Sequence, residues 1–447
     1  MKISRIFIIN RGEIAVRIIR TCKVMGIETI LAVSEADKDS LPAKLADQIV
    51  LIGPPSPSKS YLNIPVIITA ALAMKADAVH PGYGFLSEVP ELAEACLANG
   101  LIYIGPKPHH IQKMGNKLVS RALAKECGIP VLPGSEKVSS YNEIVGIIDA
   151  IGLPVMLKAA AGGGGRGMKI ITDKANIKTI FESASAEAKS AFGDGTMYVE
   201  KYIANARHIE VQVLGDRHGN VIHLGERDCS TQRRHQKLVE EATAPNISET
   251  LRENIRSAAV KLAKSISYEN AGTVEFIVDQ DEEAFYFLEM NTRIQVEHPV
   301  TEAITGVDLV QEQIHVATGE ELRFTQSDIV FSGHAMECRI NAESPEEGFR
   351  PDPGRITLWQ MPQGPGVRVD THCYHGYTVP VFYDSMIAKL IVHGNDRLHA
   401  INRMLAALDE FSVGGIKTTI PFLKQILKDE DFSNGRVSTR LLEKVLL

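Results

Sequence analysis

Apolar and polar positions alternate in two different ways along the first hundred residues. The apolar run IFIIN at 6–10 is followed by EIAVRIIRTCKVMG at 13–26, in which apolar side chains recur every three or four positions. The first pattern predicts a buried strand and the second an amphipathic helix. The same reasoning predicts strands at 26–34, 77–82 and 101–106 and helices at 65–76 and 90–100. Such an alternation indicates βαβ units and a mostly parallel sheet.

The turn after the first strand bears on whether this unit binds a dinucleotide. That turn is NRGE at 10–13, and it lacks the GxGxxG spacing that brings a backbone close to a pyrophosphate. The unit therefore resembles a dinucleotide-binding half in its order of elements, but we assign it no nucleotide.

The pattern changes beyond residue 108. A helix over roughly 109–127 is predicted to lead into a second unit, with strands at 153–160, 168–172 and 196–203 and a helix at 181–192. From about Arg207 strands dominate, at 208–216, 221–229, 272–279 and 284–292, with helices at 251–266 and 308–319. A mixed pattern continues from about 332 to 447 without a repeat or a low-complexity linker, so we expect the units to pack as one body.

Composition and charge restrict the class of protein. With 447 residues, 44% hydrophobic and 23% charged, the chain is typical of a soluble globular protein of two or three domains. The net charge of −7 argues against nucleic acid as the main partner, and no apolar run is long enough to span a membrane. The chain begins with a strand-like run rather than a signal or transit peptide. Six scattered cysteines without a CxxC pair argue against a zinc site or disulfide framework. We therefore expect a cytoplasmic protein.

A glycine-rich segment, KAAAGGGGRGMKIIT at 158–172, lies between two predicted strands. Glycine loses the most backbone freedom on folding, so a run of glycines indicates that the backbone must come close to another group here. A Rossmann turn would be followed by a helix, and a P-loop would continue as GK[ST]; here the strand-like MKIIT follows, so both fail. A hairpin flap whose amides close over phosphates is left, with Lys158 near a phosphate as a point charge. The alternative is a flexible surface loop.

A second constellation is GTVEFIVDQDEEAFYFLEMNTRIQVEHP at 272–299. In a hairpin centred near Glu282, Glu275 and Glu289 would stand opposite each other, and opposed carboxylates repel unless a cation bridges them. Mg²⁺ is the usual ion held by carboxylates and nucleotide phosphates. This prediction depends on the register, because a slip of one residue would place the two side chains on opposite faces.

Alternation after Glu289 predicts a polar face on a continued strand, with Asn291 near the metal and with Arg293 and Glu297 able to hold and deprotonate a small anion. The alternative is a solvated strand face. A further segment, GERDCSTQRRHQK at 225–237, forms a local basic patch suited to an anion, with a solvated turn as its alternative.

Together these residues resemble the ATP-grasp superfamily and, more narrowly, biotin carboxylase. The matching segments, spread over essentially the whole chain, are NRGEIAVRIIR, HPGYGFLSE, MGNK, KAAAGGGGRGM, EKYI, RHIEVQVLGD, ERDCSTQRRHQK, EMNTRIQVEHPVTE and ECRINAE. The chain departs from the family pattern at Asn116, where aspartate is usual, and at Thr231, where a larger apolar residue is usual.

The resemblance implies an α/β ATP-grasp fold in three domains. These are a Rossmann-like, doubly wound domain at 1–113, a mobile glycine-rich lid domain with its connecting helix at 114–204, and an ATP-grasp and α+β C-terminal domain at 205–447. It also implies ATP contacts from Lys117, Lys158, Gly164, Gly165, Glu200, Lys201, Ile203, His208, Gln232, His235, Glu275 and Glu289.

The same resemblance implies roles at the reaction centre. Mg²⁺ or Mn²⁺ would be held by Glu275, Glu289 and Asn291. Bicarbonate would be bound by Lys237, Arg293, Gln295 and Val296. Catalysis would depend on Glu297 as the base, on Arg339 as the stabiliser of charge on biotin, and on Lys237 and Arg293, while Tyr83 would lie near the biotin ring.

The implied activity is the ATP-dependent carboxylation of biotin on a biotin carboxyl carrier protein. Because the sequence ends at Leu447 without a carrier or carboxyltransferase domain, we expect a separate subunit, often a homodimer, that works with carboxyltransferase subunits in acetyl-CoA carboxylase and fatty acid synthesis. The alternatives are a subunit of pyruvate or another acyl-CoA carboxylase, an ATP-grasp ligase with another acceptor such as a carbamoyl-phosphate type, and a nucleotide-binding protein without catalysis.

Overall fold

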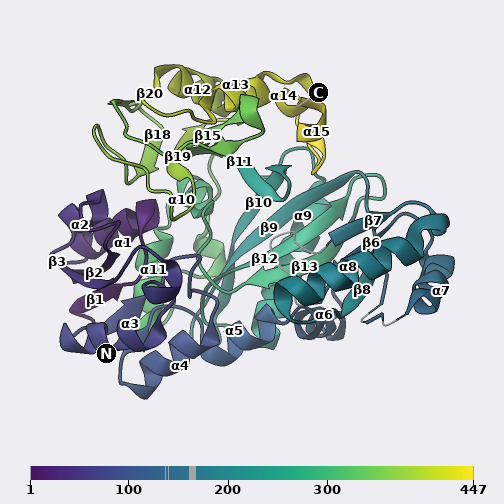
Figure 1. Cartoon of the computed structure of the whole chain (residues 1–447), viewed down its shortest axis with the longest axis horizontal. Coiled ribbons are helices and arrows are strands. Elements are labelled where there is room, and N and C mark those ends of the chain that lie inside the picture. Colours follow the sequence, from purple (N-terminus) through teal and green to yellow (C-terminus); the bar gives the residue numbers. More distant parts are fainter. Residues whose placement is uncertain (1, 136, 139, 161–167, 446–447) are drawn as a thin grey trace.

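The computed structural model describes residues 2–135, 137–138, 140–160 and 168–445. Its N-terminal part is a five-stranded parallel sheet in the order β3-β2-β1-β4-β5, as the βαβ pattern predicted (Figure 1). The strands are β1 (Arg5–Ile8), β2 (Glu28–Ser34), β3 (Gln48–Gly53), β4 (Ala78–His80) and β5 (Ile102–Tyr103). The helices are α1 (Gly12–Val24), α2 (Leu41–Leu45), α3 (Ile64–Ala73) and α4 (Pro90–Ala98). The edge strand β3 was not predicted, because its four consecutive apolar residues show no alternation between faces; two of them, Ile49 and Leu51, are exposed.

The single helix predicted at 109–127 is wrong. The structure has two helices, α5 (Pro108–Gly115) and α6 (Lys117–Glu126), separated at Asn116. Asn116 has an extended backbone, and its side chain accepts hydrogen bonds from the amides of Leu118 and Val119. An asparagine in this geometry is an N-cap, so it ends one helix and begins the next.

A small antiparallel sheet, β7-β6-β8, forms a separate layer with its own core, at the right in Figure 1. We call it the lid sheet; its strands are β6 (Val155–Ala159), β7 (Met168–Ile171) and β8 (Met197–Lys201), and its helices are α7 (Tyr141–Ile151) and α8 (Ile177–Phe192). The predicted arrangement of strand, glycine loop and strand is confirmed, since Lys158 pairs with Met168 across β6 and β7. The loop itself, 161–167, lies outside the described residues.

The largest sheet has eight strands in the order β13-β12-β9-β10-β11-β14-β19-β18 and is antiparallel throughout. Its strands are β9 (Ala206–Gly215), β10 (Val221–Arg233), β11 (Gln236–Ala242), β12 (Asn270–Asp279), β13 (Ala284–Asn291), β14 (His334–Asn341), β18 (Val367–Thr371) and β19 (Met386–Gly394). The helices of this part are α9 (Glu249–Ser265), α10 (His298–Thr305), α11 (Leu309–Ala317), α12 (Arg397–Glu410), α13 (Ile420–Lys428), α14 (Glu430–Ser433) and α15 (Leu441–Val445).

Short elements complete the chain. They are the strands β15 (Glu343–Ser344), β16 (Arg350–Pro351), β17 (Leu358–Gln360) and β20 (Ser412–Gly414) and the 3₁₀ turns η1 (Pro57–Lys59), η2 (Lys174–Asn176), η3 (Gln326–Asp328) and η4 (Pro345–Glu347). One hydrophobic core is shared by α1, α11 and both large sheets, so the N-terminal unit and the eight-stranded sheet pack as one body, as expected.

All six cysteines are free, and five of them are buried. No helix in the described ranges combines the length and the apolar character needed to cross a lipid bilayer.

A buried ion pair ties the C-terminal helices to the large sheet. Glu241 of β11 accepts hydrogen bonds from Arg397 (Nε, 2.7 Å) and His334 (Nε2, 2.9 Å). Burial favours the neutral acid, but these hydrogen bonds outweigh it and lower the pKa of Glu241 to about 2.

We expect Glu241→Gln to lower the free energy of unfolding by up to about 3 kcal/mol at neutral pH. A carboxylate with a lowered pKa contributes stability above its unfolded pKa near 4.5 and loses it as the pH falls toward the folded value of about 2. Urea unfolding at pH 7 and at about pH 3 measures this: the variant and the wild type should differ at pH 7 and converge at low pH. A difference that is the same at both pH values would contradict the assignment.

Candidate functional site

The hairpin of β12 and β13 carries the predicted pair of carboxylates. Glu275 stands opposite Glu289 in the antiparallel register, so the register on which the prediction depended is confirmed. Asn291 lies on the same face two residues on, and its Nδ2 donates to Oε1 of Glu275 at 2.7 Å. The three predicted metal ligands are therefore brought together on one face of the sheet.

The predicted continuation of the strand to Glu297 is wrong. β13 ends at Asn291, the chain then leaves the sheet, and Glu297 lies at the N-cap position of α10. The chain turns so that Gln295 still reaches the site, where its Nε2 donates to Glu275 at 2.8 Å. The polar side chains thus gather through the fold of an irregular segment rather than through the pleat of a strand.

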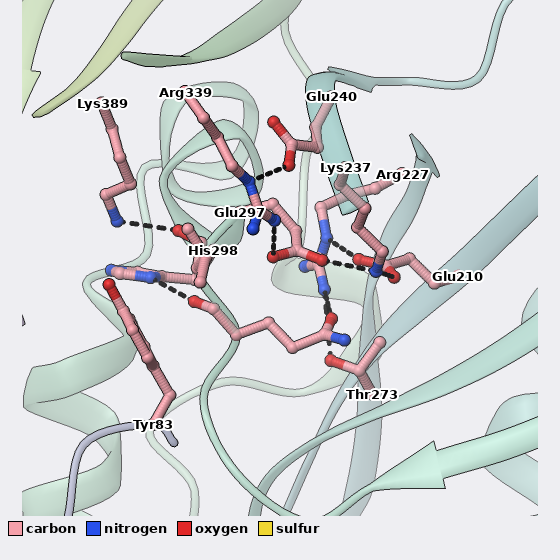
Figure 2. Close-up of polar contacts among 12 residues, drawn as sticks. Tyr83, Glu210, Arg227, Lys237, Glu240, Thr273, Glu297, His298, Arg339 and Lys389 are labelled. Carbon is pink, nitrogen blue, oxygen red and sulfur yellow. Dashed lines mark hydrogen bonds and ion pairs between the residues drawn. The ribbon is translucent and has the colours of Figure 1, made fainter. Parts of the chain in front are cut away.

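Lys237 lies at the centre of this site. Its ammonium contacts Glu210 at 2.6 Å and Glu297 at 2.6 Å (Figure 2). It also lies 3.3 Å from Glu275. Burial on its own would lower the pKa of Lys237, but the negative groups around it raise the pKa well above its usual value. The lysine is therefore a fixed positive charge between three carboxylates.

Glu297 is held between two cations. One oxygen accepts from Lys237 at 2.6 Å and the other from Nη2 of Arg339 at 3.0 Å. Burial favours the neutral acid, yet Lys237 and Arg339 hold the pKa of Glu297 well below its usual value. Figure 2 shows its carboxylate between these two side chains, while Glu240 holds Arg339 from the other side. Glu297 is therefore an ionised group placed next to cations that can bind a small anion.

The two predicted phosphate-binding lysines lie on separate elements and pair with different carboxylates. Lys117, at the start of α6, lies 3.6 Å from Glu289, and Lys158 of the lid sheet lies 2.5 Å from Glu200. His208 of β9 contacts Glu275 at 2.9 Å. These cations and carboxylates from three parts of the chain surround one region, as a nucleotide phosphate site requires.

Other predicted residues have different contacts. Glu200 is engaged by Arg121 as well as by Lys158, and Nζ of Lys201 points to the backbone carbonyls of residues 151–153. Ile203 follows β8, and Gln232 pairs in register with Lys237. His235 lies in the turn between β10 and β11, where burial and the nearby Lys158 lower its pKa. Gly164 and Gly165 fall outside the described residues.

The residues predicted for bicarbonate and biotin also have defined contacts. Arg293 contacts Asn291 at 3.1 Å and Glu88 at 2.9 Å, and the carbonyl of Val296 accepts from Nζ of Lys389 at 2.7 Å. The hydroxyl of Tyr83 donates a hydrogen bond to Glu13, and burial raises the pKa of this phenol well above its usual value.

Arg227 was missed. It belongs to the segment interpreted as a basic patch, but its side chain has 0% exposure and is no solvated turn. The guanidinium donates to Glu210 at 2.6 Å and to Gln295 at 2.6 Å, and also to Gln212, Thr273 and Thr301. The available signal was Glu210, a charged residue within the apolar strand HIEVQVLGD, since buried charges need partners.

The opposed carboxylates fit a divalent cation. Burial and the neighbouring Glu275 raise the pKa of Glu289, an electrostatic cost that a bound cation would relieve. A second group of donors, His208, Glu210 and Glu275, is also close enough to share an ion, but the ammonium of Lys237 already contacts two of its members. The oxygen donors Glu275, Glu289 and Asn291 are the set that suits Mg²⁺ or Mn²⁺.

Paired carboxylates on a large antiparallel sheet, together with Lys117 of α6 and Lys158 of a small lid sheet, are typical of an ATP-grasp fold. Family models match the whole of this architecture: "Biotin carboxylase, N-terminal domain" over residues 2–111, "Carbamoyl-phosphate synthase L chain, ATP binding domain" over 116–325, and "Biotin carboxylase C-terminal domain" over 337–444.

Known proteins resemble the chain over its full length. A pyruvate carboxylase subunit of Methanothermobacter thermautotrophicus is 54% identical over 99% of this chain and 90% of its own length. Biotin carboxylase of Nostoc sp. is 52% identical over 100% of both chains. The biotin carboxylase domain dimer of the Hydrogenobacter thermophilus 2-oxoglutarate carboxylase, solved with MgADP, ADP and bicarbonate, is 47% identical with a TM-score of 0.95, covering 100% of this chain and 99% of that one. The chain belongs to the biotin carboxylase family.

Proposed function

We propose that the protein catalyses the ATP-dependent carboxylation of biotin carried on a biotin carboxyl carrier protein, with bicarbonate as the source of carbon. The observation that carries this proposal is the position of Glu297, an ionised carboxylate held at 2.6 Å by Lys237 and at 3.0 Å by Arg339. A base placed between two cations is suited to binding an anion and removing its proton.

The first step would activate bicarbonate. Lys237, Arg293, Gln295 and the backbone of Val296 would hold the anion, and Glu297 would accept its proton. The freed oxygen would attack the γ-phosphorus of ATP, the bond to the β-phosphate oxygen would break, and ADP and carboxyphosphate would form. Lys117 and Lys158 would neutralise charge on the phosphates, with the remaining predicted ATP contacts around the nucleotide. A flap at 161–167, with Gly164 and Gly165, would exclude water from carboxyphosphate.

The second step would transfer the carboxyl group to biotin. Tyr83 would lie near the biotin ring. The bond between the carboxyl carbon and the phosphate oxygen of carboxyphosphate would break, the phosphate that leaves would accept the proton of N1, and N1 would then bond to the carbon. The negative charge that develops on the ureido oxygen when N1 loses its proton would be stabilised by the guanidinium of Arg339. Glu275, Glu289 and Asn291 would hold Mg²⁺ or Mn²⁺, which supplies charge neutralisation at the phosphates when it is bound.

We propose the domain boundaries 1–113, 114–204 and 205–447, and the separate core of the lid sheet supports the middle domain. We propose a homodimer, by analogy with the related domain described as a dimer. We propose a cytoplasmic enzyme, since six free thiols suit a reducing compartment.

The proposed physiological setting is acetyl-CoA carboxylase in fatty acid synthesis, with carboxyltransferase subunits as the other partners. The second candidate is the carboxylase subunit of a pyruvate carboxylase, which is favoured by the 54% identity to a protein of that name.

ADP release by the purified protein tests the proposed activity. With Mg-ATP present, we expect release to depend strongly on both bicarbonate and free biotin, because the anion must be activated before biotin can accept it. Turnover that needs bicarbonate but ignores biotin would indicate another acceptor. Nucleotide binding without turnover would contradict the enzymatic function.

A further inference from the structure

Two buried glutamates lie opposite each other behind Arg339. Glu240 of β11 pairs in register with Glu337 of β14, and both side chains have 0% exposure. Directly opposed residues of antiparallel strands point to the same face, with Cβ atoms about 5 Å apart. The two carboxyl groups therefore share one small space that excludes water.

Hydrogen bonding in this space is incomplete while both groups are carboxylates. Oε1 of Glu240 accepts from Nε of Arg339 at 2.6 Å, whereas its Oε2 and both oxygens of Glu337 are buried without a partner among the described residues. Two carboxylates are acceptors only and cannot satisfy each other. A single proton on Glu337 would convert it into a donor to the free oxygen of Glu240.

The surrounding charges favour that single proton. The charged and titratable groups that face the pair are Lys237, Arg339, Lys389, Glu297, Tyr83, Cys229 and Cys338. Burial, opposed by Arg339 and helped by Glu297, raises the pKa of Glu240 to about 7, and burial raises the pKa of Glu337 well above its usual value. Like charges held this close cannot both ionise at neutral pH.

We propose that Glu240 and Glu337 share one proton and that the pair orients Arg339 for the reaction at biotin, with Glu240 as the ionised partner. The proposal rests on the proposed function. Glu240 holds Nε of Arg339 and Glu297 holds Nη2, whereas Nη1 makes no hydrogen bond within the described residues (Figure 2). The side chain is 14% exposed, so Nη1 is the group left for the ureido oxygen of biotin. Glu240 and Glu337 are thus positioning residues.

Glu240→Gln removes the charge that anchors Nε. We expect it to lower biotin-dependent kcat about 10-fold to 100-fold, and to lower ATP cleavage with bicarbonate alone much less, because only the biotin step uses Arg339 in this way. The wild-type biotin-dependent kcat should rise through a limb near pH 7 as Glu240 ionises, and the variant should lack that limb. An unchanged pH profile together with an equal loss in both reactions would overturn the proposal.

Glu337 supplies the test of the shared proton. Glu337→Leu removes the donor, so the ionised form of Glu240 is disfavoured and the limb should move to higher pH. Glu337→Gln restores a neutral donor and should return the limb toward the wild-type position. If Glu337 were instead ionised, Glu337→Leu would remove a negative charge and move the limb to lower pH.

A matched control and a spectroscopic measurement complete the experiment. Glu241 is the next residue on β11, buried on the opposite face, so Glu241→Gln should lower stability without moving the limb. Infrared spectra of the wild type at a pH above the limb should show a protonated carboxyl band that is lost in Glu337→Gln, independently of any turnover, because Glu240 is ionised in both proteins. If the band behaves in this way but ADP release does not depend on biotin, the proposed function is contradicted and the shared proton is retained. If the wild type lacks the band, the shared proton is contradicted.

Discussion

Glu297→Gln is expected to lower kcat for bicarbonate-dependent ADP release by about 10²- to 10⁴-fold, the usual contribution of a general base. Glutamine preserves the shape of the side chain but cannot accept the proton of bicarbonate. The low pKa of Glu297 reflects the two cations beside it. A bound bicarbonate anion would offset those cations and raise that pKa, so the carboxylate becomes a stronger base when its substrate is present.

The measurement combines single-turnover ADP formation with nucleotide binding by calorimetry. We expect ATP binding to persist in Glu297→Gln, because Lys117 and Lys158 are unchanged. Glu302→Gln is the matched control: Glu302 is a buried glutamate on the following helix, paired with Arg17 at 2.7 Å and Arg368 at 2.8 Å and not with Lys237. A Glu297→Gln variant that keeps more than about a tenth of the wild-type kcat would show that Glu297 is not the base.

Arg227→Met is expected to give the largest loss of stability, about 3 to 5 kcal/mol, the range for breaking a buried ion pair by removing one partner. The guanidinium donates five hydrogen bonds. Without it, Glu210 still contacts Lys237, but the buried amide and hydroxyl oxygens that accepted the other hydrogen bonds lose this donor. Since Gln295 would lose its contact, kcat should fall as well.

Chemical denaturation followed by circular dichroism measures the effect as a shift in the unfolding midpoint. The surface control is Arg436→Met: this arginine pairs with Glu430 and Asp431, and its side chain is 53% exposed. Exposed pairs contribute little, so we expect almost no shift of the unfolding midpoint. Equal midpoint shifts in the two variants would mean that the buried ion pair contributes no more to stability than the exposed one.

Sequence patterns were most successful where one local periodicity decides the structure. Strands and helices with a clear apolar period, such as β9, β12 and α9, were predicted close to their observed bounds. The helix break at Asn116 was missed because capping depends on one backbone conformation that an apolar pattern does not encode. The half-exposed strand β3 was missed for a related reason, since its apolar residues gave no contrast between faces.

The site shows the same division. The register that places Glu275 opposite Glu289 could be predicted from hairpin symmetry alone, and the family could be recognised from its motifs. Periodicity failed after Asn291, because the chain leaves the sheet there and turns Gln295 and Glu297 into the site by an irregular path.

The βαβ unit and the strand–glycine–strand arrangement can be read from the amino-acid sequence, because they follow from local period. The set of residues expected to bind ATP, metal and bicarbonate came from the resemblance to the family. Only the tertiary structure shows which charged side chains contact one another. Lys237 faces three carboxylates, Arg227 is buried rather than solvated, and Glu240 is opposed to Glu337. These contacts join strands that are far apart in the chain, and the strength of a charge depends on burial and on neighbours that no local pattern specifies.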